Sequence, residues 1–111
     1  MTPEEQNNLT FGITPDNGCS GVSGSALRLN YSGLCLSDAE NGLRGTDLTT
    51  GFASGVSVAA SWNADLASSR ALYMGAEFKR KGSHVILGPV VGPLGRIALD
   101  GRNWVGPPIT A

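Results

Sequence analysis

The apolar residues of this chain fall into short runs between glycine-rich and proline-rich stretches, and each run predicts one element of structure. Residues 34–36 form an apolar run that ends at a serine and an aspartate, which is typical of a buried strand. Residues 56–60 and residues 84–87 form two further runs of strand length. The pattern therefore predicts three short strands.

Helical patterns occur in two places. Residues 2–8 open with a threonine, a proline and a glutamate, the residue types that cap and begin a helix. Asn63 is a suitable cap for the longest helical pattern, which runs over residues 64–81 and ends before Gly82. Residues at helical spacing predict the buried stripe of this helix: Ala67, Ala71, Met74 and Phe78.

The order of these elements predicts an α/β fold. A strand, a helix and a strand in succession form a βαβ unit, in which the two strands pair in parallel across a right-handed crossover. Residues 11–33 and 39–52 are rich in Gly, Ser and Asn, and we expect them to be loops. Sixteen glycines and six prolines in 111 residues suit a segment of a larger, loop-rich protein better than a compact small domain.

Composition excludes several classes of function. The net charge is −1 and no basic patch stands out, so nucleic acid is not an expected partner. No run approaches the roughly 18 apolar residues that a membrane span needs. His84 is the only histidine and has no cysteine or histidine at ligand spacing, so we expect no metal site.

Two features depend on the cellular compartment. Cys19 and Cys35 flank an irregular segment, and they are either a disulfide worth roughly 3 kcal/mol or two buried thiols. The triplets that begin at Asn8 and Asn30 permit N-glycosylation if the chain is secreted. No secretory signal is visible, so the protein is either intracellular or lacks its true amino terminus here.

Three polar residues are candidates for ligand binding. Asp38 follows a buried strand directly, which places it at the rim where α/β proteins bind ligands, and its carboxylate can accept hydrogen bonds from two neighbouring hydroxyls. The alternative is that Asp38 caps a turn. If Arg44 does not bind a ligand, it is a surface charge or a partner of Asp47. The guanidinium donors of Arg102 form a planar fork that suits a ligand with several hydroxyls, and the alternative for this residue is a structural ion pair.

The same residues carry a family resemblance. Residues 34–44 read Leu-Cys-Leu-x-Asp-x-x-x-Gly-x-Arg, residues 92–96 read Gly-Pro-Leu-Gly-Arg, and residues 101–104 read Gly-Arg-Asn-Trp. These motifs closely resemble the N-terminal domain of glycoside hydrolase family 3 β-glucosidases, especially the fungal secreted type. The resemblance covers residues 1 to about 104 and implies the N-terminal βαβ portion of a partial (β/α)8, TIM-like barrel, a domain that usually needs about 250 residues.

The resemblance implies a function for the parent protein. It would hydrolyse terminal non-reducing β-D-glucosyl residues with retention, acting on β-glucosides or cello-oligosaccharides in cellulose and β-glucan breakdown, outside the cell and without a cofactor. Asp38 would bind the hydroxyls of the glucose in the innermost subsite, Arg102 would donate beside it, and Arg44 would line or brace the pocket. Arg96 would support its loop. The resemblance also implies secretion and a bridge between the two cysteines.

The chain also departs from the family. Residues 39–41 are Ala-Glu-Asn where the family has Ser-Pro-Leu, and residues 105–111 leave the pattern, with Val105 in place of a glutamate. The family's nucleophile and acid/base lie beyond Ala111, so residues 1–111 form one incomplete domain that we expect to be inactive and poorly stable alone. We expect Trp62 and Trp104 to be packing residues, with a role as sugar platforms as the alternative. The alternative is a non-catalytic carbohydrate-binding or interaction module, or a degenerate truncated product.

Overall fold

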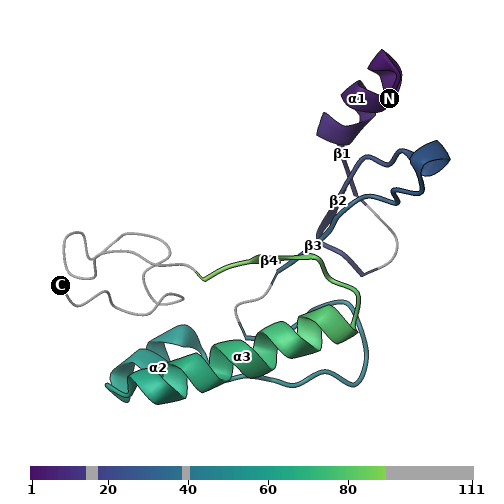
Figure 1. The fold of residues 1–111 in the computed structure, drawn as a ribbon. Coiled ribbons are helices and arrows are strands. Elements are labelled where there is room, and N and C mark those ends of the chain that lie inside the picture. The colour runs from purple at the N-terminus through teal and green to yellow at the C-terminus, as the bar shows by residue number, and fades with distance from the viewer. Residues whose placement is uncertain (15–17, 39–40, 90–111) are drawn as a thin grey trace.

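The computed structural model describes residues 1–14, 18–38 and 41–89. The predictions for Arg96, Arg102 and Trp104 lie outside these residues. Figure 1 shows two parts that share one sheet. We call residues 1–14 and 18–33 the amino-terminal arm; the other part contains the two later helices, which run beside the last strand.

Helix α1, Pro3–Thr10, begins as its sequence predicts. The Thr2 hydroxyl accepts from the Glu5 N–H at 3.2 Å, and the Glu5 carboxylate accepts from the Thr2 N–H at 2.8 Å. This reciprocal capping box satisfies two of the N–H groups that a helix start leaves without partners. The predicted first helix is therefore confirmed, and it continues two residues further than expected.

Helix α3, Ala64–Arg80, is also confirmed with its caps. The Asn63 side chain accepts from the Leu66 N–H at 3.0 Å. At the other end Gly82 has φ 85°, in the left-handed region, and its N–H donates to the Lys79 carbonyl at 3.2 Å. The Ser83 N–H donates to the Phe78 carbonyl at 3.0 Å, which completes a Schellman motif.

Within the described residues, four short strands form one mixed sheet in the order β1-β2-β3-β4. Their bounds are Gly12–Ile13, Gly21–Ser23, Cys35–Asp38 and Val85–Leu87. β3 and β4 pair in parallel, with Leu36 opposite Val85 and Asp38 opposite Leu87. The predicted parallel pairing across the helix is therefore present, but its first strand is β3 and not the predicted strand at residues 56–60. β1, β2 and β3 pair in antiparallel fashion. The prediction that residues 11–33 are only loop is therefore wrong, because they contain two strands and the 3-10 helix Leu27–Leu29.

Residues 56–60 do not form the predicted strand. They belong to helix α2, Gly55–Ala60, which begins at Ser54. The Ser54 hydroxyl accepts from the Ser57 N–H at 3.4 Å, and the Val58 N–H donates to the Ser54 carbonyl at 3.1 Å. A serine cap and two alanines favour a helical turn, whereas a five-residue apolar run alone fits either structure.

The core lies between the second half of α3 and the loop that precedes α2. Phe78 is 1% exposed and packs with Met74 and Leu43, while Phe52 and Ile86 cover the edges. The prediction that Ala67 and Ala71 are buried is wrong for the described residues, where both are exposed. The apolar stripe of α3 continues along the whole helix in the sequence, but the described residues bury only its carboxyl-terminal half.

Candidate functional site

Asp38 is the last residue of β3, so it lies at the carboxyl end of the parallel strand pair. Its N–H donates to the Ser20 hydroxyl at 2.9 Å, which fixes the main chain. Side chains alternate along a strand, and the neighbouring Ser37 is buried at 2% exposure. The Asp38 side chain keeps 48% of its surface exposed, so its carboxylate is accessible to a ligand.

Arg44 lies beside this carboxylate. Its Nη1 is 3.7 Å from Asp38 Oδ2, and its side chain is 77% exposed. This separation is longer than a hydrogen bond, and a pair so open to water contributes little to stability. Both groups therefore retain hydrogen-bonding capacity on the same surface, as a binding site for a polyhydroxylated ligand requires. Among the described residues the ion-pair partner of Arg44 is Asp38, not the Asp47 considered from the sequence, and the Arg44 side chain is mostly exposed.

The loop that carries Arg44 is anchored to α3 at two points. The Thr50 N–H and hydroxyl donate to the two carboxylate oxygens of Glu77, at 2.9 Å and 2.6 Å. These hydrogen bonds lower the pKa of Glu77, because they stabilise its ionised form. The Lys81 ammonium donates to the Asp47 carbonyl at 2.7 Å. The long helix thereby fixes the loop on which Arg44 lies.

A disulfide joins Cys19 of the arm to Cys35 at the start of β3, with 5.6 Å between the Cα atoms. It holds the residue after Cys19, which is Ser20, against the main chain of Asp38. Ser20 is a positioning residue that the sequence reasoning missed. Its signal was only its place next to a cysteine in a segment predicted to be loop.

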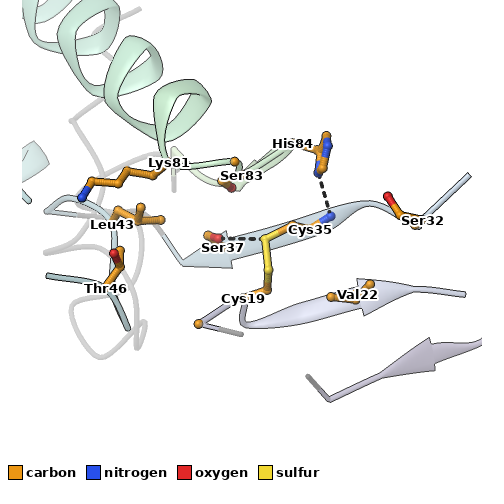
Figure 2. A pocket seen from close by; sticks show the side chains of 13 residues that line it. Cys19, Val22, Ser32, Cys35, Ser37, Leu43, Thr46, Lys81, Ser83 and His84 are labelled. Atoms are coloured by element: carbon orange, nitrogen blue, oxygen red, sulfur yellow. Dashed lines mark hydrogen bonds between the residues drawn. A yellow bond between two sulfur atoms is a disulfide. The ribbon is translucent and has the colours of Figure 1, made fainter. Parts of the chain in front are cut away.

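A cavity of about 280 Å³ lies around the disulfide and is separate from the Asp38 carboxylate. Figure 2 shows Ser37 beside the Cys35 sulfur and His84 beside the Cys35 main-chain nitrogen, with Lys81 and Leu43 at the other side of the cavity. The His84 Nδ1 accepts from the Cys35 N–H at 3.0 Å. This hydrogen bond gives the only histidine of the chain a structural role between β3 and the start of β4.

Residues 1–14, 18–38 and 41–89 contain neither a metal-binding cluster nor a membrane-spanning helix. No three histidine, cysteine or carboxylate side chains gather there as a metal site would require. None of the helices in that part of the chain is both long and apolar enough to cross a membrane.

Comparison with known proteins identifies the family. Over 106 residues the chain is 58% identical to the probable β-glucosidase M of Aspergillus niger. Its fold matches a β-glucosidase from Chaetomium thermophilum with a TM-score of 0.81 at 46% identity. It also matches the glycoside hydrolase family 3 β-glucosidase of Neurospora crassa with a TM-score of 0.81 at 42% identity. The chain therefore belongs, as a segment, to the glycoside hydrolase family 3 β-glucosidases.

Each match covers 96% of the chain but only a small share of the relative. That share is 14% for the Aspergillus niger protein and 13% for each of the two structures. No protein-family model matches the chain. The described residues of this β-glucosidase segment form a small mixed β-sheet with helices, which is consistent with an α/β fold. The family resemblance seen in the sequence is confirmed.

One predicted packing residue behaves differently. Trp62 is 79% exposed and has φ 52°, in the left-handed region that bulky residues rarely occupy. The prediction that Trp62 packs is therefore wrong within the described part of this β-glucosidase segment. The predicted partner of Asp38, Arg102, lies outside that part, so the structure brings together only Asp38 and Arg44.

Proposed function

We propose that the chain is the first portion of the (β/α)8-like barrel of a secreted β-glucosidase. The longer enzyme would hydrolyse terminal non-reducing β-D-glucosyl residues with retention, using β-glucosides or cello-oligosaccharides as substrates and no cofactor. The observation that carries this proposal is the place of Asp38. It ends a parallel strand beside Arg44, and barrel enzymes bind their substrates at the carboxyl ends of such strands.

In this proposal Asp38 accepts hydrogen bonds from two adjacent hydroxyls of the glucose in the innermost subsite. Arg44 braces the Asp38 carboxylate from the side at 3.7 Å, and Arg102 donates to the same sugar. Contacts to hydroxyls remote from the cleaved bond increase the rate by holding that bond in position. The roles of these residues are therefore in binding and positioning rather than in the covalent step.

The chemistry itself would come from elsewhere in the longer enzyme. A retaining glycosidase needs two carboxyl groups about 5–5.5 Å apart, one as nucleophile and one as acid and base. Asp38 and its neighbour Arg44 form a carboxylate and cation pair, which does not meet this requirement. We therefore expect no turnover from residues 1–111 alone.

Secretion is the second part of the proposal. The disulfide between Cys19 and Cys35 supports it, because such bonds persist in oxidising compartments and are rare in the cytosol. A disulfide that closes a loop of this length also stabilises the arm against the sheet, by roughly 3 kcal/mol in chain-entropy terms. The amino-terminal arm would then reach its folded position only after oxidation.

The test is to replace Asp38 in the longer enzyme with Asn and to measure kcat and KM on cellobiose. Loss of two charge-assisted hydrogen bonds should lower kcat/KM by about 10²-fold or more. Asp47→Asn is the matched control, because Asp47 lies in the adjacent loop and contributes its main-chain carbonyl to the Lys81 contact. The control should keep kcat/KM within about threefold of the parent value.

Equal activity in the Asp38→Asn and Asp47→Asn enzymes would exclude Asp38 from the sugar site. Absence of any β-glucosidase activity in the properly folded longer protein would remove the functional proposal as a whole. Turnover by purified residues 1–111 would contradict only the expectation that the chain is inactive alone.

A further inference from the structure

The tip of the amino-terminal arm is a tight turn with a fixed main chain. The 3-10 helix Leu27–Leu29 ends at Asn30, which has φ 58° and ψ 33°. Ala26 and Tyr31 exchange two backbone hydrogen bonds across the turn, at 2.9 Å and 3.3 Å. Asparagine tolerates the left-handed conformation better than other residues with a side chain, apart from its close relative aspartate. The turn thus holds its backbone while it presents the Asn30 side chain to solvent.

Asn30 begins the triplet Asn-Tyr-Ser, which is the acceptor signal for N-linked carbohydrate. Asn30 and Ser32 are exposed, and neither side chain makes a hydrogen bond with another residue of the described chain. Tyr31 between them is partly buried, with its hydroxyl 3.4 Å from the Ser23 hydroxyl. Asn30 and Ser32 therefore remain exposed after folding, so the folded chain has room for a carbohydrate on Asn30, while Tyr31 anchors the triplet.

The other triplet is presented differently. Asn8 lies in the last turn of α1, and its side-chain amide nitrogen already donates to the Ser25 carbonyl. Its main chain also packs directly against Gly24, so that a Cβ at that position would collide with the Asn8 carbonyl. The structure therefore gives Asn30 the clearer case for modification.

Apolar surface beside Asn30 gives a carbohydrate something to cover. Leu27 is 75% exposed and Leu29 is 45% exposed on the same short turn, which is drawn in blue at the outer end of the arm in Figure 1. Arg28 between them is held to Glu5 at 2.8 Å, so the turn stays docked on α1. A carbohydrate attached at this turn would shield the two leucines from other molecules.

We propose that Asn30 carries an N-linked oligosaccharide, an inference that rests on the secretion proposed above. The donor is a lipid-linked oligosaccharide diphosphate. A bond forms between Asn30 Nδ2 and C1 of the terminal N-acetylglucosamine, and the bond between that C1 and the diphosphate oxygen breaks. The lipid diphosphate leaves with its electron pair, and Nδ2 gives up one proton. The product is a glycosylated turn at the end of the arm.

The experiment uses the longer enzyme, expressed through the secretory pathway of a yeast. Trypsin releases residues 29–44 as one peptide, because arginines precede and end it and no lysine or arginine lies between. This peptide contains a single acceptor triplet. Treatment with peptide N-glycosidase in ¹⁸O water converts a glycosylated asparagine into labelled aspartate, which mass spectrometry then detects in both the secreted and the retained protein.

We expect most copies of the peptide to be labelled at Asn30. Ser32→Ala should abolish the label and Ser32→Thr should retain it, and these two matched variants separate loss of the signal from loss of folding. An unlabelled parent peptide, in the retained as well as the secreted pool, would overturn the proposal. β-Glucosidase activity is assayed on the same samples, so that an active but unlabelled enzyme contradicts only the glycan, and a labelled but inactive one contradicts only the proposed function.

Discussion

Glu5 and Arg28 form a two-point ion pair that joins the first helix to the tip of the arm. Arg28 Nε is 2.8 Å from Glu5 Oε1, and Arg28 Nη2 is 2.9 Å from Glu5 Oε2. The same carboxylate caps the start of α1 through the Thr2 N–H. Together these contacts hold the pKa of Glu5 at about 2, below its ordinary value of 4.5, with the hydrogen bond from Arg28 as the largest cause.

The first prediction concerns acid stability. Because the folded pKa of Glu5 is lowered, its stabilising contribution is fully present above pH 4.5 and is lost as the pH falls toward about 2. Glu5→Gln should therefore lower the thermal midpoint at pH 6 slightly and flatten the decline in stability between pH 4.5 and pH 2. The measurement is the thermal midpoint of the longer enzyme across that pH range.

Glu4→Gln is the control for this prediction. Glu4 lies in the same first turn of α1, where it interacts with the helix dipole as Glu5 does. The Glu4 variant should keep the pH dependence of the parent protein. Parallel pH curves for the Glu5 variant and the parent would show that the ion pair with Arg28 has no influence on stability.

The second prediction concerns the core. Phe78 is 1% exposed and contacts the cluster that connects α3 to the Arg44 loop, so Phe78→Ala should cost about 3–5 kcal/mol of unfolding free energy. Phe78→Leu should cost less, because most of the apolar volume remains. Urea unfolding measures both variants. Equal losses from the two substitutions would argue that the side-chain volume at this position is unimportant.

The third prediction concerns His84. Its Nδ1 accepts from the Cys35 N–H at 3.0 Å, so His84→Ala should cost about 1 kcal/mol through loss of that hydrogen bond. His84→Asn places an amide oxygen near the position of Nδ1 and should retain most of the stability. The readout is the unfolding free energy together with hydrogen exchange of the Cys35 amide. Fast exchange in the Ala variant and slow exchange in the Asn variant are expected; equal exchange would contradict the acceptor role.

Sequence patterns predicted the elements whose signals are local. Asn63 and Gly82 define the ends of α3, and the apolar runs on either side of the helices define β3 and β4. The order strand, helix, strand predicted a parallel pair, but with residues 56–60 as its first strand, whereas β3 takes that place in the structure. The second strand prediction failed because the run at residues 56–60 is too short to reveal its period, and the Ser54 cap decided for a helix.

The antiparallel half of the sheet was not predictable in this way. β1 and β2 have two and three residues, too few for a visible alternation of apolar and polar positions. Their places depend on long-range contacts such as the disulfide at Cys35 and the donation from Asp38 to Ser20. At the candidate site, Asp38 could be predicted from its position after a strand, whereas Ser20 could not, because its partner is 18 residues away in sequence.

The disulfide at Cys35 has a consequence for Asp38, which follows three residues later on the same strand. Because side chains alternate along a strand, the covalent bond fixes which face each later residue occupies. Inserting or deleting one residue between Cys35 and Asp38 would turn the carboxylate to the face of Ser37, even though every residue of the proposed sugar site would still be present. The disulfide therefore determines on which face of β3 the Asp38 side chain lies. The three-residue separation between Cys35 and Asp38 is required for the proposed sugar site.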